Sequence, residues 1–356
     1  MTNYHFKNLV FEGGGVKGAA YVGALQVLES KGILENIERV GGTSAGAINA
    51  VLIGLGFSIE ETDAFLKDPN LFKSFEDSDV GFFRDTWRLI NEFGWCKGDV
   101  FFEWISDRIA EKTGNPKATF ADIDKMKYEK QFKSLYLIGT NLSTASYEVF
   151  SCEDTPDMSV ADAARISMSI PLFFRAIKRQ RKDNQQIQDI YVDGGVLNNY
   201  PVRLFDRKKY ISNSDDFFTP NYYEEANSSI PGDQKETLEY VYNKETLGFR
   251  LDSKAEISKF RKYADLQEGE SSKPKEIDGL YSYLKMMLNN LLAAQQSSHL
   301  NNNDWARTIY IDTHDVDATD FDLELDKKND LVTWGKDGTE KFFAWYDDAS
   351  KVKPNG

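Results

Sequence analysis

Two glycine-rich segments close to the N-terminus constrain the fold more than any other feature of this chain. The first, Gly13–Gly18 (GGGVKG), follows the apolar residues 9–11, and the second, Gly42–Gly46 (GTSAG), follows the short apolar segment Ile37–Val40. An apolar stretch of helical length comes after the second, at Ala45–Leu55. A strand, a tight turn and a helix in succession, repeated twice, indicate an α/β protein whose turns meet at one edge of a mostly parallel sheet.

The second segment has the pattern G-x-S-x-G, which presents a serine on a sharp turn between a strand and a helix. Gly42 and Gly46 flank Ser44 because side chains at those positions would collide across the turn. Ser44 would begin the helix, where backbone amides favour developing negative charge. Such a pattern occurs by chance in roughly one chain in ten of this composition, so the strand before it and the helix after it carry the inference to a nucleophile.

The first segment also fits G-x-G-x-x-G, and a dinucleotide-binding oxidoreductase is therefore an alternative. A dinucleotide site needs an acidic residue at the end of the second strand, but that strand leads into Gly42 and Ser44, and Glu38 lies inside it. A phosphate-binding P-loop is a weaker match because Ala19 and Ala20 stand where lysine and a hydroxyl are needed. The small residues can instead offer backbone amides to an oxyanion.

A nucleophilic serine needs a proton acceptor, and histidine is the usual one. The chain has three histidines, His5, His299 and His314. His5 precedes the first strand, and the other two lie in polar runs typical of loops. His299 or His314 would keep the chain order Ser, Asp, His that α/β-hydrolases use, so a catalytic triad stays open.

Asp193 is the better candidate for the proton acceptor. It follows the apolar segment Ile190–Val192 and precedes Gly194 and Gly195, which leave room for close approach. A carboxylate at the C-terminal end of a strand points into the crevice where α/β proteins bind ligands. The alternative is an ordinary Asp-Gly turn without a chemical role.

The motifs GGGVKG, GTSAG and DGG in this order resemble the patatin-like phospholipase family, and Ala164–Pro171 and Thr246–Leu251 resemble further parts of it. The resemblance implies a lipid acyl hydrolase with a serine–aspartate dyad, in which Ser44 is the nucleophile and Asp193 the proton acceptor. It also implies a three-layer fold with a mostly parallel central sheet, helices on both faces and a helical cap insertion. Glycines would form the oxyanion hole at Gly13, Gly14, Gly15 and Gly18, and would support the motifs at Gly42, Gly46, Gly194 and Gly195.

The order of segments along the chain predicts a single catalytic domain over residues 1–350 and a short tail at 351–356. Within the domain, residues 57–130 are expected to form the helical cap, over the C-terminal edge of the sheet, and residues 206–300 a polar and helical elaboration. Short apolar segments alternate with helical ones, as in a sheet covered on both faces. The strands are predicted at residues 9–11, 37–40, 135–140, 190–192 and 308–312.

Composition narrows the class of partner. A net charge of −14 excludes a nucleic-acid groove, and the densest basic run, Lys178–Lys182, is predicted to be a solvated hairpin between two strands. Cys96 and Cys152 show no paired spacing or metal signature, so neither a disulfide, a metal nor a cofactor is expected. The segment Met1–Lys7 does not resemble a signal peptide, and no stretch of 18 apolar residues occurs, so a cytoplasmic protein is expected, with non-classical export left open.

The expected partner is a lipid or phospholipid substrate, with peripheral and mostly apolar contact to a membrane. Two regions could supply that contact: an aromatic series within residues 65–105, and a helical stripe of leucines and methionines within Tyr281–Gln296. Each pattern is also typical of a buried helix face. A catalytically idle lipid-binding or scaffold protein is the third alternative, and the pattern does not separate a hydrolase from an acyltransferase.

Overall fold

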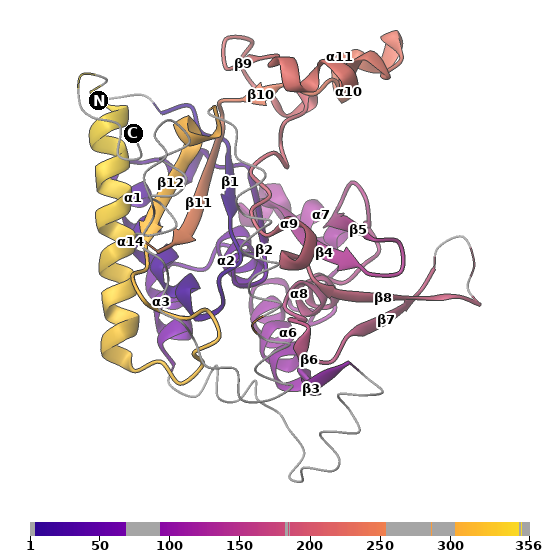
Figure 1. Cartoon of the computed structure of the whole chain (residues 1–356), viewed down its shortest axis with the longest axis vertical. Helices are drawn as coiled ribbons and strands as arrows, with labels where there is room; N and C mark the ends of the chain where they lie inside the picture. The colour runs from indigo at the N-terminus through magenta and orange to yellow at the C-terminus, as the bar shows by residue number, and fades with distance from the viewer. Residues whose placement is uncertain are drawn as a thin grey trace.

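The computed structural model describes residues 4–68, 93–181, 184, 186–253, 286, 303–348 and 350. Its centre is a mixed sheet with the strand order β12-β11-β1-β2-β4-β8-β7, in which β5 also pairs with β4 (Figure 1). The strands of this sheet are β1 (Asn8–Phe11), β2 (Arg39–Thr43), β4 (Ser134–Asn141), β5 (Ser146–Ser151), β7 (Ile177–Gln180), β8 (Gln188–Asp193), β11 (Thr246–Asp252) and β12 (Thr308–Asp312).

Two small pairs of strands and several helices complete the described part. The pairs join β3 (Gly94–Cys96) to β6 (Leu172–Phe174), and β9 (Phe217–Phe218) to β10 (Tyr242–Asn243). The α-helices are α1 (Ala20–Ser30), α2 (Ala45–Gly54), α3 (Ile59–Lys67), α6 (Asp99–Thr113), α7 (Phe120–Lys130), α8 (Val160–Ser167), α9 (Gly195–Asn198), α10 (Glu224–Ser228), α11 (Lys235–Leu238) and α14 (Leu325–Tyr346). The 3-10 helices are η1 (Gly15–Ala19), η2 (Leu34–Asn36), η3 (Lys208–Tyr210), η4 (Asn221–Tyr223), η5 (Gly232–Gln234) and η6 (Asp304–Arg307).

The strands from β12 to β4 are parallel, as the sequence predicts. The second strand differs from the prediction, because it begins at Arg39 and continues through Gly41 and Gly42 to Thr43. Both glycines are needed in the strand, since a Cβ on Gly41 would lie 2.5 Å from a Leu204 methyl and one on Gly42 would lie 2.4 Å from the backbone of Gly46. The strand therefore ends directly at Ser44.

The other end of the sheet is antiparallel, which the sequence did not predict. The predicted strand at 190–192 is part of β8, and β8 runs antiparallel to β4 and to β7. On β4, Ile138 pairs with Thr43 of β2, and the next residue, Gly139, pairs with Asp193 of β8. Since β5 occupies the opposite edge of β4 along these residues, β2 and β8 share one edge and their C-terminal ends meet there.

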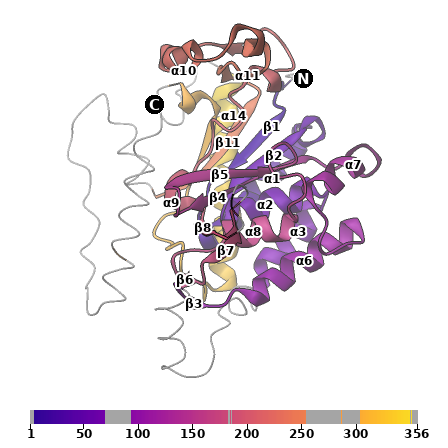
Figure 2. The ribbon, with the colours of Figure 1, turned by 90° about the vertical axis from the view of Figure 1, so that its right-hand side faces the viewer.

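The two faces of the sheet are covered differently (Figures 1 and 2). Helices α1, α2, α8 and α14 cover one face and form the large apolar core with inward-facing side chains such as Leu9, Phe11 and Leu137. The segment that follows α9 covers the other face, where Val10 and Tyr136 pack against Phe205 and Tyr210. The predicted α/β architecture, a mostly parallel central sheet flanked by helices, is confirmed.

The predicted cap region is described only in part, by α3, β3, α6 and α7. Phe101 in α6 is buried in the core and Trp104 packs against it, which is the ordinary use of such aromatics. The aromatic residues of the series between 69 and 92, the helical stripe at Tyr281–Gln296 and His299 lie outside the described residues. The division of the domain into a cap and an elaboration stays a prediction.

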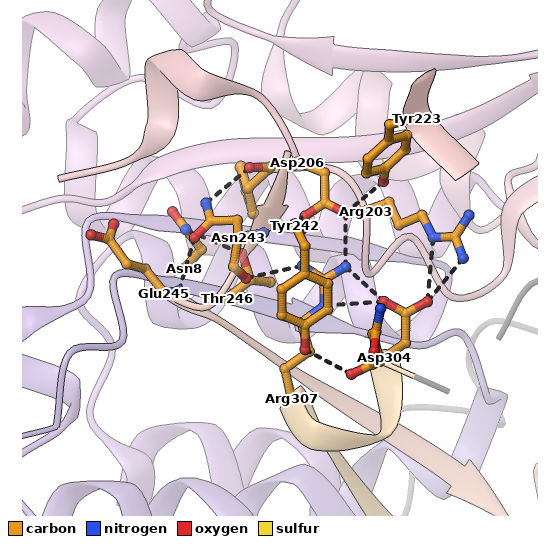
Figure 3. A network of polar contacts seen from close by, with 12 residues as sticks. Asn8, Arg203, Asp206, Tyr223, Tyr242, Asn243, Glu245, Thr246, Asp304 and Arg307 are labelled. Carbon is orange, nitrogen blue, oxygen red and sulfur yellow. Dashed lines mark hydrogen bonds and ion pairs between the residues drawn. The ribbon is translucent and has the colours of Figure 1, made fainter. Parts of the chain in front are cut away.

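A buried polar network holds the extension formed by residues 206–245 to the sheet (Figure 3). The guanidinium of Arg307 donates to Asp206 (2.5 and 2.8 Å) and to Asp304 (2.7 Å), and Arg203 pairs with Asp304 from the far side (3.0 Å). A buried cation is stable in a protein only with such partners. The network lies at the N-terminal ends of β1, β11 and β12, opposite the edge where Ser44 lies, so it supports the fold and leaves the site free.

Candidate active site

Ser44 lies on a sharp turn between β2 and α2. Its backbone has φ 55° and ψ −125°, a conformation that L side chains rarely adopt, and it is the N-cap residue of α2. A Cβ on Gly46 would lie 2.4 Å from the carbonyl oxygen of Phe11 and 2.6 Å from that of Glu12, so only glycine allows α2 to approach β1 this closely. The predicted turn is present, and its two glycines serve the close packing expected of them.

The surroundings of Ser44 come from the end of α8, to which the sequence assigned no role. The Ser44 amide donates to Ser167 Oγ (3.0 Å), and the Ser44 hydroxyl contacts Met168 Sδ (3.6 Å). Ser44, Ser167 and Met168 are all buried. The thioether sulfur of Met168 is only a weak hydrogen-bond acceptor.

Asp193 lies beside Ser44 because β2 and β8 end at adjacent residues of β4. Its amide donates to the Ser169 carbonyl (2.8 Å), and its Oδ1 accepts from the Gly195 amide (2.7 Å). Its Oδ2 is buried and has no hydrogen-bond partner of ordinary geometry among the described residues. Burial raises the pKa of Asp193 to about 7, and the Gly195 amide and the Ser44 hydroxyl offset part of that rise. The carboxylate therefore faces Ser44 with one oxygen available.

The first glycine segment begins directly after β1 and lies against the same site. The Gly13 amide donates to the Asn199 carbonyl (3.0 Å), so it is already engaged. Gly15 has φ +54°, and a Cβ there would lie 1.9 Å from the Ala318 carbonyl oxygen. The amides of Gly14 and Gly15 have no acceptor among the described residues. Gly18 serves packing, since a Cβ there would lie 3.1 Å from that of Ala45 at the start of α2.

Asn199, which sequence reasoning missed, ties the glycine segment to the segment carrying Asp193. Besides its carbonyl contact, its Nδ2 donates to the Gly13 carbonyl (3.0 Å) and reaches Glu12 Oε1 (3.5 Å). Its Oδ1 occupies the space beside Gly13 and Gly195, where added Cβ atoms would approach it to 2.3 and 2.8 Å. In the sequence, Asn199 is connected with the site only by lying six residues after Asp193, and no motif marks a residue at that spacing.

Glu12, directly before the glycine segment, binds the neighbouring strand β11. Its Oε2 accepts from the Leu251 amide (2.8 Å), and its Oε1 lies 3.7 Å from Arg250 Nε, while Arg250 also pairs with Asp252 (2.7 Å). These three charged side chains are buried. The strand ends of β1 and β11 are thereby held together beneath the segment.

The two described histidines lie away from Ser44. His5 lies before β1, near Tyr346 and Asp216, at the end of the sheet opposite Ser44. His314 follows β12, where it contacts Asp312 (3.7 Å) and the ring of Trp334 (4.2 Å between centroids), and β11 and β1 separate β12 from β2. Neither is a hydrogen-bond partner of Ser44 or Asp193.

The geometry also bears on the dinucleotide alternative. Glu38 comes just before β2 rather than inside it, at the end of the sheet opposite the glycine segment, and pairs with Lys7 at the surface (3.3 Å). A ribose bound at the glycine segment could not reach this carboxylate. The feature that a dinucleotide site requires is therefore missing from the place where it should act.

Comparison with known proteins agrees with this geometry. The family model described as "Patatin-like phospholipase" matches residues 9–206, which include Ser44, Asp193 and the glycine segment. The chain therefore belongs to the patatin-like phospholipase family. It is 29% identical over 347 residues to the uncharacterized protein YqhO of Bacillus subtilis, covering 94% of this chain and 96% of that protein.

Two further similarities extend the comparison. The chain is 29% identical over 201 residues to the probable lipid hydrolase 463L of Invertebrate iridescent virus 6, covering 56% of this chain and 63% of the viral protein. Its fold is similar to the crystal structure of VipD from Legionella pneumophila, with a TM-score of 0.54 and 18% identity, over 95% of this chain and 66% of that one. At this identity the structural similarity concerns the fold alone.

Proposed function

We propose that this protein is a serine lipid acyl hydrolase of the phospholipase A or lysophospholipase type, which cleaves fatty-acyl esters through Ser44 and Asp193. The observation that carries the proposal is that Thr43, directly before Ser44, pairs with Ile138 of β4, and Asp193 pairs with the next residue, Gly139. Family membership and the similarity to a probable lipid hydrolase support a lipid substrate. In the described part of the chain no helix is long and apolar enough to cross a bilayer.

In the first half of the reaction, Ser44 Oγ attacks the acyl carbonyl carbon while its proton passes to Asp193 Oδ2. The amides of Gly14 and Gly15 are available to donate to the oxyanion of the tetrahedral intermediate. The start of α2 adds its dipole at the same place. The carbon–oxygen bond to the alcohol then breaks, the alcohol takes the proton from Asp193, and the acyl group remains on Ser44.

In the second half, water attacks the acyl carbon and gives its proton to Asp193. The bond to Ser44 Oγ breaks, Ser44 regains the proton, and the fatty acid leaves. If another hydroxyl replaced water at this step, the product would be a transferred acyl chain, so the identity of the product separates a hydrolase from an acyltransferase.

The environment of Asp193 makes it a suitable base. A carboxyl with an ordinary pKa is too weak a base to take a serine proton near neutral pH, and the ideal pKa of a general base is close to the working pH. Burial raises the pKa of Asp193 to about 7. Its buried Oδ2 has no competing donor among the described residues, so the Ser44 proton would be its partner in the reaction.

The proposal predicts a pH dependence. Asp193 must be ionised to accept the proton, so the rate of fatty-acid release is expected to rise about tenfold per pH unit below pH 7 and to level off above it. The measurement is the pH profile of kcat/KM on a soluble short-chain ester, with fatty acid quantified by mass spectrometry. A rate that levels off already at pH 5 would contradict the role of a buried carboxylate with a raised pKa.

Asn199 provides a second prediction. Asn199→Ala removes the side-chain contacts that join Gly13 and Glu12 to the Asp193 segment, so the amides of Gly14 and Gly15 are expected to lose their alignment. We expect kcat to fall by about 10²-fold with KM changed less than threefold, as when a transition-state contact is displaced. The control is Asn36→Ala on the surface at η2, which should leave both constants unchanged. A change in KM with kcat unaltered would contradict the positioning role.

A further inference from the structure

The end of α8 contacts both members of the candidate dyad. Ser167 Oγ accepts from the Ser44 amide (3.0 Å), and the Ser169 carbonyl accepts from the Asp193 amide (2.8 Å). Ser167 is the last residue of α8 and Ser169 follows two residues later, so one short turn holds the backbones of Ser44 and Asp193. This alignment matters for the reaction, because a displacement of about 1 Å can lower a rate by about 10²-fold.

Arg165 holds this turn with its buried side chain. Its Nη1 donates to Ser169 Oγ (2.7 Å), and the Ser169 hydroxyl in turn donates to the Arg165 carbonyl (2.8 Å). The guanidinium also lies over the ring of Phe174, 5.5 Å from its centroid. A guanidinium has several donors in one rigid plane, whereas a lysine ammonium is a compact point charge. Arg165 can therefore fix the turn and still reach a second segment.

The second segment is the end of the strand pair β3–β6. Arg165 Nη2 donates to the carbonyl of Lys97 (2.5 Å), the residue after β3, and to that of Arg175 (3.4 Å), the residue after β6. β3 and α6 belong to the predicted cap region, and Asp99 of α6 pairs with the Arg175 side chain (3.1 Å). In Figure 1, α8, α6 and the pair β3–β6 lie next to one another. Arg165 thus connects this part of the cap region with the turn that holds the dyad.

A glycine in the cap region makes room for the Arg165 side chain. Gly98, the N-cap residue of α6, has φ 72°, and a Cβ there would lie 2.3 Å from Arg165 Nη2 and 2.4 Å from its Cζ. Gly114 at the other end of α6 has φ 81°, but a Cβ there would meet no neighbouring segment of the described chain within 4 Å. Alanine would strain the backbone at both positions, but only at Gly98 would it also displace the guanidinium.

We propose that Arg165 is a positioning residue for the reaction: through the end of α8 it fixes Ser44 and Asp193 relative to each other, and it makes their alignment depend on the strand pair β3–β6. The proposal rests on the proposed function, which it deepens by naming what controls the alignment of that site. The role of Arg165 is geometric rather than electrostatic, because burial, the Gly195 amide and the Ser44 hydroxyl are what shift the pKa of Asp193.

The first test is Arg165→Met, which keeps an apolar stem and removes every donor. We expect kcat on a soluble short-chain ester to fall by about 10²-fold with KM changed less than threefold, because the dyad loses its alignment. The midpoint of the pH profile should stay at about 7, whereas the loss of a cation that acted by its charge would move the midpoint upward. The matched control is Arg203→Met in the network opposite the site, which should lower Tm and leave kcat unchanged.

The second test disturbs the same contact from the cap region. Gly98→Ala is expected to lower kcat by about tenfold, while Gly114→Ala should keep kcat although its backbone is strained in a similar way. In the Arg165→Met background, Gly98→Ala should lower kcat by less than about twofold more, because the guanidinium that it would displace is gone.

Four results would each overturn the proposal: wild-type kcat in Arg165→Met, a raised KM with unaltered kcat, an upward shift of the pH midpoint, or equal losses in Gly98→Ala and Gly114→Ala. Failure of the proposed function would be seen separately, as a wild type that does not hydrolyse the ester at all.

Discussion

Replacing Ser44 by alanine is expected to lower the release of fatty acid by at least about 10⁴-fold, because no other group can carry the acyl chain. Ser44 is buried, begins α2 and has the backbone strain typical of a presented nucleophile. The measurement is kcat/KM on a soluble short-chain ester and on phosphatidylcholine vesicles. The control is Ser30→Ala at the exposed end of α1, which should keep full activity.

A second variant separates the loss of the hydroxyl from a loss of fold. The conformation of Ser44, with φ 55°, is one that glycine adopts at little cost. Ser44→Gly should therefore be as inactive as Ser44→Ala while its Tm is equal to or higher than that of the wild type. Activity retained in either variant at more than about a hundredth of the wild-type rate would remove Ser44 from the mechanism.

Replacing Asp193 by asparagine is the second large effect. We expect kcat to fall by about 10³–10⁴-fold, because an amide cannot accept the Ser44 proton. The variant should keep the fold, since an amide oxygen can still accept from the Gly195 amide as Oδ1 does. His314→Ala is the matched control for the triad alternative and is expected to keep nearly full activity. His299→Ala should do the same.

The stability of this variant provides a readout that a loss of activity alone does not. Burial raises the pKa of Asp193 to about 7 from an ordinary value near 4, so the folded wild type holds this proton more tightly than the unfolded chain. The contribution of Asp193 to stability is thus complete below pH 4 and is lost as the pH rises to 7. The Tm of Asp193→Asn relative to wild type should increase between pH 4 and 7 and then remain constant. A Tm difference between the two proteins that does not change with pH would contradict a buried carboxyl group with a raised pKa.

Much of the site could be predicted from local sequence. Glycine patterns after apolar segments mark Gly13–Gly18 and the Ser44 turn, because close backbone approaches require glycine at fixed spacings. The strands at 9–11, 135–140 and 308–312 agree with β1, β4 and β12 to within a residue at each end. Asp193 was placed at the end of a strand, and β8 does end there.

Other features depend on contacts between distant segments. An apolar strand does not reveal its direction, so the antiparallel course of β8, which brings Asp193 toward Ser44 from the opposite side, could not be derived. Gly41 and Gly42 were not expected in β2 because glycine is a poor strand former, and their presence there is explained only by packing against Leu204 and α2. The contacts of Asn199 and Ser167 likewise exist only once α9 and α8 are placed.

The most direct test of the central claim is labelling with a fluorophosphonate, which reacts with an activated serine, followed by mass spectrometry of the modified peptide. We predict a single adduct on Ser44 in the wild type, none in Ser44→Ala, and labelling at least about 10²-fold slower in Asp193→Asn. An adduct on another serine, or no adduct on a folded protein that still binds lipid, would contradict the account and favour a catalytically idle lipid-binding protein.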